Sequence, residues 1–344
     1  MEHMKNNWKK TIKIGKFTIG KNHPSFVIAE GGINHNGDVR LAKKLIDAAV
    51  DANANAIKFQ TFITNRIISK NISPQVFKII KKYELSPENF GELKDHSRKR
   101  DIIFCSTPFD TTSCDLLTKL HVPLYKIGSG DLDNIPLIMH ASKKKKPILL
   151  STGMSTNQDI AEALRSVAPH NKEIALLHCT SIYPANFNEA NLNQISSLRG
   201  KFNILVGYSD HTLGFEVSLA AVCLGACIIE KHLTLDNNMK GPDHKTSLNP
   251  SDFKTMVKKI RNIEESFGSY HKQVLQREQG IRKAARRSII SIQDIPKGKI
   301  IDNTNVDILR PAGGIKPKYF GKVLGKEAKT TIKEGSLLQW NMLS

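Results

Sequence analysis

Eight short apolar runs, separated by amphipathic helical patterns, constrain the fold of this 344-residue chain more than any other feature. The runs are Phe26–Ala29, Ala56–Phe59, Ile102–Ser106, Leu124–Ile127, Ile148–Ser151, Ile174–His178, Ile204–Tyr208 and Ile228–His232, and helical patterns between them include Arg40–Ala52, Asn89–Arg100, Thr112–Lys119 and Phe215–Leu224. Strands that alternate with helices indicate parallel βαβ units. Eight such units in about 250 residues predict a (β/α)8 barrel. A doubly wound open sheet is the alternative, although no GxGxxG follows the first run.

The pattern changes after Gly268, where the apolar runs become shorter and turn residues more frequent. We expect a barrel domain over residues 1–268 with an N-terminal extension, a linker over 269–285, and a small β-rich domain over 286–344. The β segments expected in the small domain are Arg287–Ile292, Ile295–Gly298, Asp307–Arg310, Pro311–Gly314 and Thr331–Gly335. A domain this small is marginally stable alone, so we expect it to dock on another surface.

Composition excludes several classes of protein. No apolar run is long enough for a membrane span, and the polar, lysine-rich segment Met1–Lys21 lacks the apolar core of a secretory signal. The five cysteines match no zinc spacing, and we expect Cys223 and Cys227 to be buried free thiols on a core helix. These features favour a reducing cytoplasm and no membrane contact.

The chain is strongly basic, with a formal net charge of +19. Nucleic-acid binding is one explanation of such a charge. However, the basic residues are scattered apart from the run Lys143–Lys146, and no aromatic residues interleave with that run. We therefore expect no nucleic-acid partner, a solvated helix end at this run, and a positive field that attracts small anionic substrates.

A polar or ionisable residue stands at or just after the end of each apolar run. These residues are Glu30, Lys58, Thr107, Lys126 with Ser129, Ser151, His178 with Tyr183, Ser209 with His211, and His232. The carboxyl ends of the strands form the catalytic face of a barrel, so this distribution predicts an active site there.

Two kinds of site follow from these residue types. His211 and His232 follow neighbouring strands and are the best metal candidates, with Glu30 able to add charge from the adjoining strand. Two lysines and several hydroxyls suit a phosphorylated anion: Lys58, Lys126, Ser129, Ser151 and Ser209. Either lysine could alternatively form a Schiff base, as in aldolases.

At this point the motifs resemble those of the sialic acid synthase family. The matching segments occur in order along residues 20–344: Ile28–Gly37, Ile57–Gln60, Ser106–Asp110, Tyr125–Gly130, Leu150–Met154, Leu177–Thr180, Gly207–Gly214, Glu230–His232 and Gly241–His244. The small domain, with Arg286–Ser288 and Arg310–Pro311, is similar to the antifreeze-like, or SAF, domain of these synthases.

The resemblance implies an enzyme, a transferase that condenses phosphoenolpyruvate with the open-chain aldehyde of an N-acetylamino sugar. N-Acetylmannosamine is the first candidate, and the product is a nine-carbon 2-keto-3-deoxy acid. His211 and His232 would hold Mn2+ or Mg2+ as a Lewis acid, and Glu30 would act as general base on water. The residues that would bind phosphoenolpyruvate are Lys58, Lys126, Ser129, Ser151, Tyr183 and Ser209.

By the same resemblance, the sugar would be bound by Gln60, Asp131, Ser181, Asp243 and Arg310. Arg310 would reach the site from the small domain of the partner in a domain-swapped homodimer. Two departures concern the sugar: sialate synthases commonly have Glu in place of Asp131 and Asn in place of Ser181. They leave legionaminate or pseudaminate synthases, which use 2,4-diacetamido-2,4,6-trideoxy hexoses, as alternatives. A non-catalytic sugar-binding homologue is a more distant one.

Overall fold

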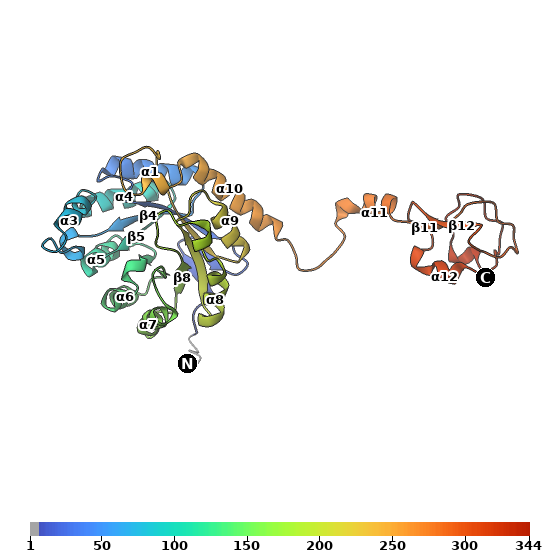
Figure 1. The fold of residues 1–344 in the computed structure, drawn as a ribbon, viewed down its shortest axis with the longest axis horizontal. Coiled ribbons are helices and arrows are strands. Elements are labelled where there is room, and N and C mark those ends of the chain that lie inside the picture. The colour runs from blue at the N-terminus through green and yellow to red at the C-terminus, as the bar shows by residue number, and fades with distance from the viewer. Residues whose placement is uncertain (1–6) are drawn as a thin grey trace. The chain divides into compact units, whose positions relative to one another are not determined.

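The computed structural model describes residues 7–344, so the first six residues of the polar segment Met1–Lys21 lie outside the described part. The chain forms two compact units, one extending to Gly268 and the other spanning Ser269–Ser344. Figure 1 shows the helices and strands of each unit.

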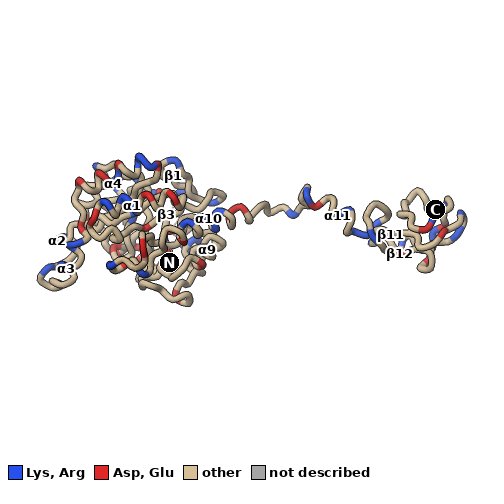
Figure 2. Tube along the Cα trace, turned by 90° about the horizontal axis from the view of Figure 1, so that it is seen from above, with Lys and Arg blue, Asp and Glu red and all other residues tan. Residues whose placement is uncertain are grey.

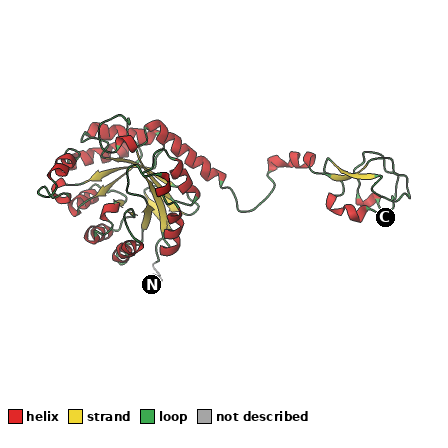
Figure 3. Ribbon diagram, viewed as in Figure 1, coloured by secondary structure: helices red, strands yellow, loops and turns green. Residues whose placement is uncertain are grey.

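The first unit is an eight-stranded, all-parallel sheet with helices around it (Figure 3). Its strands are β3 (Phe26–Gly32), β4 (Ala56–Thr61), β5 (Ile103–Pro108), β6 (Tyr125–Ile127), β7 (Ile148–Ser151), β8 (Ile174–His178), β9 (Leu205–Asp210) and β10 (Ile228–His232). They pair in the order β5-β4-β3-β10-β9-β8-β7-β6, and the two end strands, β5 and β6, lie against each other. The sheet therefore curls into a barrel, which confirms the predicted fold class.

The helices that cover the barrel follow the strands in sequence. They are α1 (Val39–Asp51), α2 (Thr64–Ile67), α3 (Pro74–Lys81), α4 (Pro87–Lys99), α5 (Thr111–Lys119), α6 (Ile135–Ser142), α7 (Asn157–Val167), α8 (Asn193–Phe202), α9 (Glu216–Cys223) and α10 (Pro250–Ser266). Local chemistry begins several of them: Asp38 and Asp110 cap α1 and α5, and Ser86 and Thr156 form capping boxes at α4 and α7. Within residues 7–344, no helix is long and apolar enough to cross a membrane.

Side chains of the strands separate into two apolar layers because successive residues point to opposite faces. Val27, Ile57 and Tyr208 belong to an outer cluster with the helices, whereas Ile28, Ala56 and Ile228 belong to an inner cluster. The interior of the barrel is thus a packed core, and the residue two positions beyond the last apolar inner residue of a strand faces the mouth of the barrel.

An antiparallel hairpin of β1 (Thr11–Ile14) and β2 (Phe17–Gly20) was not expected from the lysine-rich N-terminal segment. Its Ile12, Ile14 and Ile19 are fully buried in the inner cluster of the barrel. The turn residue Gly15 has a φ of +56° and lies against Ile103, at the start of β5. The hairpin therefore closes the amino-terminal end of the barrel, opposite the strand ends that carry the polar residues.

The second unit contains α11 (Gln279–Ala285), the antiparallel pair β11 (Ser288–Ser291) and β12 (Val306–Leu309), and α12 (Phe320–Val323). Single bridges such as Ile295 with Ile332 complete it around a small apolar core. The β segments expected near residues 287–292 and 307–310 are present. The segment Pro311–Gly314 was wrongly expected to be β. Pro311 has no amide hydrogen to donate to a neighbouring strand, and Gly313, at φ +138°, turns the chain.

The prediction that Cys223 and Cys227 are buried on a core helix is wrong. All five thiols are free, but Cys223 is exposed at the end of α9, and Cys227 lies beyond that helix and is only partly buried. Helix α9 ends at Cys223 because Gly225, at φ +84°, turns the chain into β10. Three residues of the run Lys143–Lys146 are exposed just after α6, as expected, and Lys144 pairs with Asp115. Lys and Arg are spread along both units (Figure 2).

Candidate active site

The inner columns of the barrel end in polar side chains at its carboxyl end. Glu30 lies two residues beyond Ile28, Lys58 two beyond Ala56, and Glu230 two beyond Ile228. The equivalent positions on β6, β7 and β9 are occupied by Lys126, Ser151 and Ser209, and His211 follows directly after β9. The period of two along each strand thus brings residues from distant parts of the sequence to one mouth.

Four buried charged side chains form the centre of this mouth. Lys58 Nζ lies 2.9 Å from Glu30 Oε2 and 3.7 Å from Glu230 Oε1, and Lys126 Nζ lies 3.7 Å from the same Glu230 oxygen. Each of the four side chains is at most 5% exposed. Since a buried charge is costly unless it is paired, two lysines and two glutamates together form a balanced cluster.

The surroundings of the cluster shift its pKa values in opposite directions. Burial raises the pKa of Glu30, and the opposing charge of Lys58 only partly offsets this. Burial opposes the charge of Glu230 too, but Lys126 and Lys58 together outweigh it and lower its pKa to about 2. For Lys58, burial is outweighed by Glu230 and Glu30, so its pKa is raised, whereas burial lowers the pKa of Lys126. Glu30 is therefore the carboxylate of the cluster that most readily accepts a proton.

Hydroxyl groups surround the two lysines. Lys126 Nζ donates to Ser151 Oγ at 2.6 Å and Lys58 Nζ donates to Thr107 Oγ1 at 3.2 Å. Ser209 Oγ donates to Glu230 Oε1 at 3.0 Å. Ser129 is slightly apart, where its Oγ accepts from the Gly153 amide at 3.1 Å. Ammonium and hydroxyl donors that converge on one buried mouth are suited to a small, multiply charged anion.

The two predicted metal ligands lie side by side, with ring centres 5.7 Å apart. His211 Nδ1 donates to the carbonyl oxygen of Thr180 at 2.6 Å, which leaves Nε2 as an acceptor, 2.9 Å from the Tyr183 hydroxyl. His232 Nδ1 is buried without a hydrogen-bond partner, 3.8 Å from Asp243 Oδ2. Burial lowers the pKa of both imidazoles, so both are neutral and able to ligate a cation near pH 7.

These residues fit a metal as an open, two-histidine site. Among residues 7–344, no group of three or more His, Cys, Asp or Glu is arranged to hold a metal ion. Glu30, which was expected to add charge beside the histidines, is paired with Lys58 instead. The orphaned Nδ1 of His232 and the Nε2 of His211, which contacts the Tyr183 hydroxyl, would be the two protein ligand atoms, with water and substrate oxygens as further ligands.

The predicted sugar residues are only partly brought together. Gln60 Nε2 donates to Glu30 Oε1 at 3.3 Å, and Asp243 lies beside His232. Asp131 accepts from Asn134 Nδ2 at 3.0 Å, and burial raises its pKa. The Ser181 hydroxyl fills the space in which a side chain at position 153 would stand. Arg310 is exposed in the second unit, on the residue after β12.

One central residue was missed. Glu230 was noted only as part of a motif, yet it is the carboxylate that both lysines share. A signal was present, because Glu230 lies two residues before His232 on the same strand and hence on the same face. Thr107, which accepts a hydrogen bond from Lys58, was noted among the strand-end residues but was not assigned to a site.

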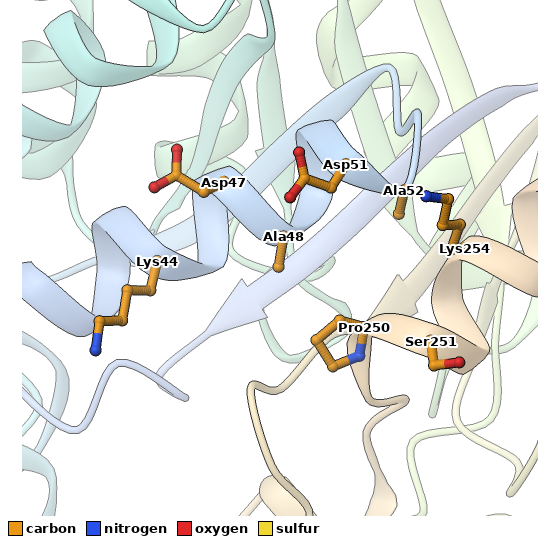
Figure 4. A pocket seen from close by; sticks show the side chains of 8 residues that line it. All are labelled: Lys44, Asp47, Ala48, Asp51, Ala52, Pro250, Ser251 and Lys254. Carbon is orange, nitrogen blue, oxygen red and sulfur yellow. The ribbon is translucent and has the colours of Figure 1, made fainter.

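A surface depression of about 410 Å3 lies elsewhere, between α1 and α10 (Figure 4). Its lining includes Lys44, Asp47, Asp51 and Lys254, and it contains none of the strand-end residues. This depression is therefore separate from the buried charged side chains at the mouth of the barrel.

Comparison with known proteins identifies the family of this chain. The model of the NeuB family matches residues 45–272, and the SAF domain matches residues 286–344. The chain is 42% identical to N,N'-diacetyllegionaminic acid synthase of Campylobacter jejuni, over 92% of this chain and 99% of that one. It is 38% identical to the Legionella pneumophila enzyme of the same name (93% and 95%), and 34% identical to human N-acetylneuraminate-9-phosphate synthase (92% of each chain).

The structure is also similar to a solved one, that of N-acetylneuraminic acid synthetase from Leptospira borgpetersenii in complex with citrate. The TM-score is 0.75 at 36% identity, over 80% of this chain and 95% of that chain. The predicted family, barrel and SAF domain are thus confirmed. The chain belongs to the NeuB family, carries a SAF domain, and is an enzyme of the phosphoenolpyruvate-condensing transferases that this family comprises.

Proposed function

We propose that this enzyme condenses phosphoenolpyruvate with the open-chain aldehyde of a 2-acetamido sugar, releasing phosphate and forming a nine-carbon 2-keto-3-deoxy acid. The buried cluster of Lys58, Lys126, Glu30 and Glu230 is the observation that carries this proposal. Two ammonium groups beside three hydroxyls would bind the phosphate and carboxylate of phosphoenolpyruvate. Ser129 and Tyr183 would complete that binding site.

The proposed reaction consists of three bond changes. Carbon 3 of phosphoenolpyruvate attacks the aldehyde carbon, water adds to the cationic carbon 2, and the bond from carbon 2 to the phosphate oxygen then breaks. The two protons of the water pass to the former aldehyde oxygen, which becomes a hydroxyl, and to the released phosphate. Glu30 would take the proton from the attacking water, since burial raises its pKa and makes it the more basic carboxylate of the cluster. A divalent cation, Mn2+ or Mg2+, held by His211 and His232, would polarise the aldehyde oxygen.

The sugar is proposed from similarity and from two substitutions in the pocket. N-Acetylmannosamine was the first candidate from the sequence, but the two N,N'-diacetyllegionaminic acid synthases are more similar to this chain than the human N-acetylneuraminate-9-phosphate synthase is. We therefore place a 2,4-diacetamido-2,4,6-trideoxy hexose first and N-acetylmannosamine second. Asp131 and Ser181, both shorter than the residues common in sialate synthases, leave more room beside the sugar.

The test is phosphate release from phosphoenolpyruvate in the presence of Mn2+ and each sugar in turn. We expect release only when a sugar aldehyde is present, with a higher kcat/KM for the diacetamido sugar. A higher value for N-acetylmannosamine would reverse the order of the two sugars. Release with neither sugar would overturn the proposed reaction. Pyruvate trapped on Lys58 or Lys126 by borohydride would instead support a Schiff-base aldolase.

A further inference from the structure

A second buried ion pair lies behind the two histidines, on the outer face of the barrel. Lys231 Nζ is 3.1 Å from Asp210 Oδ2, and both side chains are at most 1% exposed. The two residues are register partners on β10 and β9. Asp210 directly precedes His211, and Lys231 directly precedes His232.

The pair holds the backbone of the residue that follows His211. Asp210 Oδ1 accepts from the Thr212 amide at 2.9 Å and from the Thr212 hydroxyl at 2.8 Å. Lys231 Nζ donates to the Thr212 carbonyl oxygen at 2.6 Å. The second oxygen of Asp210 accepts from Ser218 Oγ, on α9, at 2.6 Å. His211 is therefore flanked on both sides by residues that the pair anchors to β10 and α9.

Stability alone does not account for charges at this position. Tyr208 and Ile229, the outward-facing residues one pleat earlier on the same strands, belong to the apolar outer layer. A buried ion pair is seldom more stabilising than apolar side chains of similar volume, so its value here lies in the geometry that it imposes. Because neighbours on a strand face opposite sides, fixing Asp210 and Lys231 outward directs His211 and His232 into the mouth.

We propose that Asp210 and Lys231 are positioning residues that set the relative placement of His211 and His232 for binding one divalent cation. The inference rests on the metal site of the proposed function. Neither residue touches substrate or metal, and they act through the backbone at Thr212 and through the register of β9 and β10. Such residues behind metal ligands typically change metal affinity by about 10–100-fold when altered.

The experiment measures Mn2+ binding to the full-length protein by titration calorimetry and by electron paramagnetic resonance of free Mn2+. The variants are Lys231→Met, which leaves Asp210 without its ion-pair partner, and Asp210→Asn with Lys231→Met, which removes both charges together. The double variant keeps the experiment decisive if Lys231→Met alone does not fold. Ile229→Ala is the matched control, because it removes a buried outward side chain from the same strand without touching the pair.

We expect the folded double variant to bind Mn2+ about 10–100-fold more weakly than wild type, with Ile229→Ala within about twofold of it. Activity of the double variant should recover in part as Mn2+ is raised, because the residues proposed to touch substrate are intact. Unchanged Mn2+ affinity in the folded double variant would overturn the inference while leaving the proposed function in place. If wild type bound no Mn2+, or bound it no more tightly than His211→Ala does, the metal site would be overturned, and the inference with it.

Discussion

His35 is a buried imidazole in the loop between β3 and α1. Its Nδ1 accepts from the Gly37 amide at 3.0 Å, and its Nε2 is buried without a hydrogen-bond partner. Burial lowers the pKa of His35 to about 4, compared with 6.5 for the free side chain. The unfolded chain therefore binds the proton more readily than the folded one, and protonation favours unfolding.

This sign gives a prediction for acid stability. Above pH 6.5, the contribution of neutral His35 to the free energy of unfolding is fully present. It is lost as pH falls from 6.5 towards 4, and the free energy of unfolding then decreases by about 3 kcal/mol in total. In His35→Asn, whose side-chain oxygen can still accept from Gly37, the free energy of unfolding should fall less over that range. Urea unfolding at a series of pH values measures this. Equal pH slopes for the two proteins would contradict the neutral, buried state of His35.

His211 has the most direct consequence for activity. A metal ion that stabilises the transition state by several kcal/mol raises the rate at least about a hundredfold. His211→Ala should therefore lower kcat/KM by that factor or more, and addition of EDTA should inactivate the wild-type enzyme. Circular dichroism should be unchanged. His140→Ala is a suitable control, because His140 lies on α6, pairs with Asp115 of α5, and is not one of the strand-end residues. A His211→Ala enzyme with wild-type kinetics would remove the residue from the site.

At the scale of elements, the hairpin β1–β2 stabilises the barrel from the end opposite the active site. Ile14 is fully buried among the inner side chains of the strands. Ile14→Ala should reduce the free energy of unfolding by about 2–5 kcal/mol, through lost burial and the cavity left behind. The folded fraction should keep its Michaelis constants.

Ile72→Ala provides the comparison for that experiment, since Ile72 is 84% exposed. Chemical unfolding followed by tryptophan fluorescence or circular dichroism measures both variants. A loss below about 1 kcal/mol for Ile14→Ala would mean that the hairpin is not part of the barrel core. The hairpin was overlooked because its alternating isoleucines stand in a lysine-rich segment, where composition concealed the period of two.

At the scale of the whole molecule, Arg310 and the domain-swapped dimer are both implied by the family resemblance. Arg310→Ala should mainly raise the KM for the sugar, because the resemblance implies that Arg310 binds the sugar. An unchanged KM would remove Arg310 from the site. In a swapped dimer, each active site would combine the barrel of one chain with the SAF domain of its partner.

Mixing two impaired variants tests the swap. After co-refolding equal amounts of His211→Ala and Arg310→Ala, half of the dimers would be mixed and would hold one complete site of two. Activity at low sugar concentration should therefore recover to about a quarter of wild type. Activity equal to the mean of the separate variants would show that each site is built from a single chain.

Much of the barrel follows from the amino-acid sequence alone. Apolar runs of β-type residues give strands wherever they can be buried, and the period of two along each strand assigns Glu30, Lys58 and Lys126 to the mouth. These relations are local, so they follow from neighbouring residues alone. The family motifs lie on these same strand ends, which is why the chemistry could be anticipated together with the fold.

Which of those residues pair depends on the three-dimensional fold. Glu30 contacts Lys58 rather than the histidines, Glu230 lies between two lysines, and Asp210 and Lys231 meet behind His211. These contacts depend on the register of β9 with β10 and of β10 with β3, and on closure of the sheet. The residues of each pair are tens to hundreds of positions apart in the sequence. Long-range packing determines whether they meet, and no local sequence pattern encodes that packing.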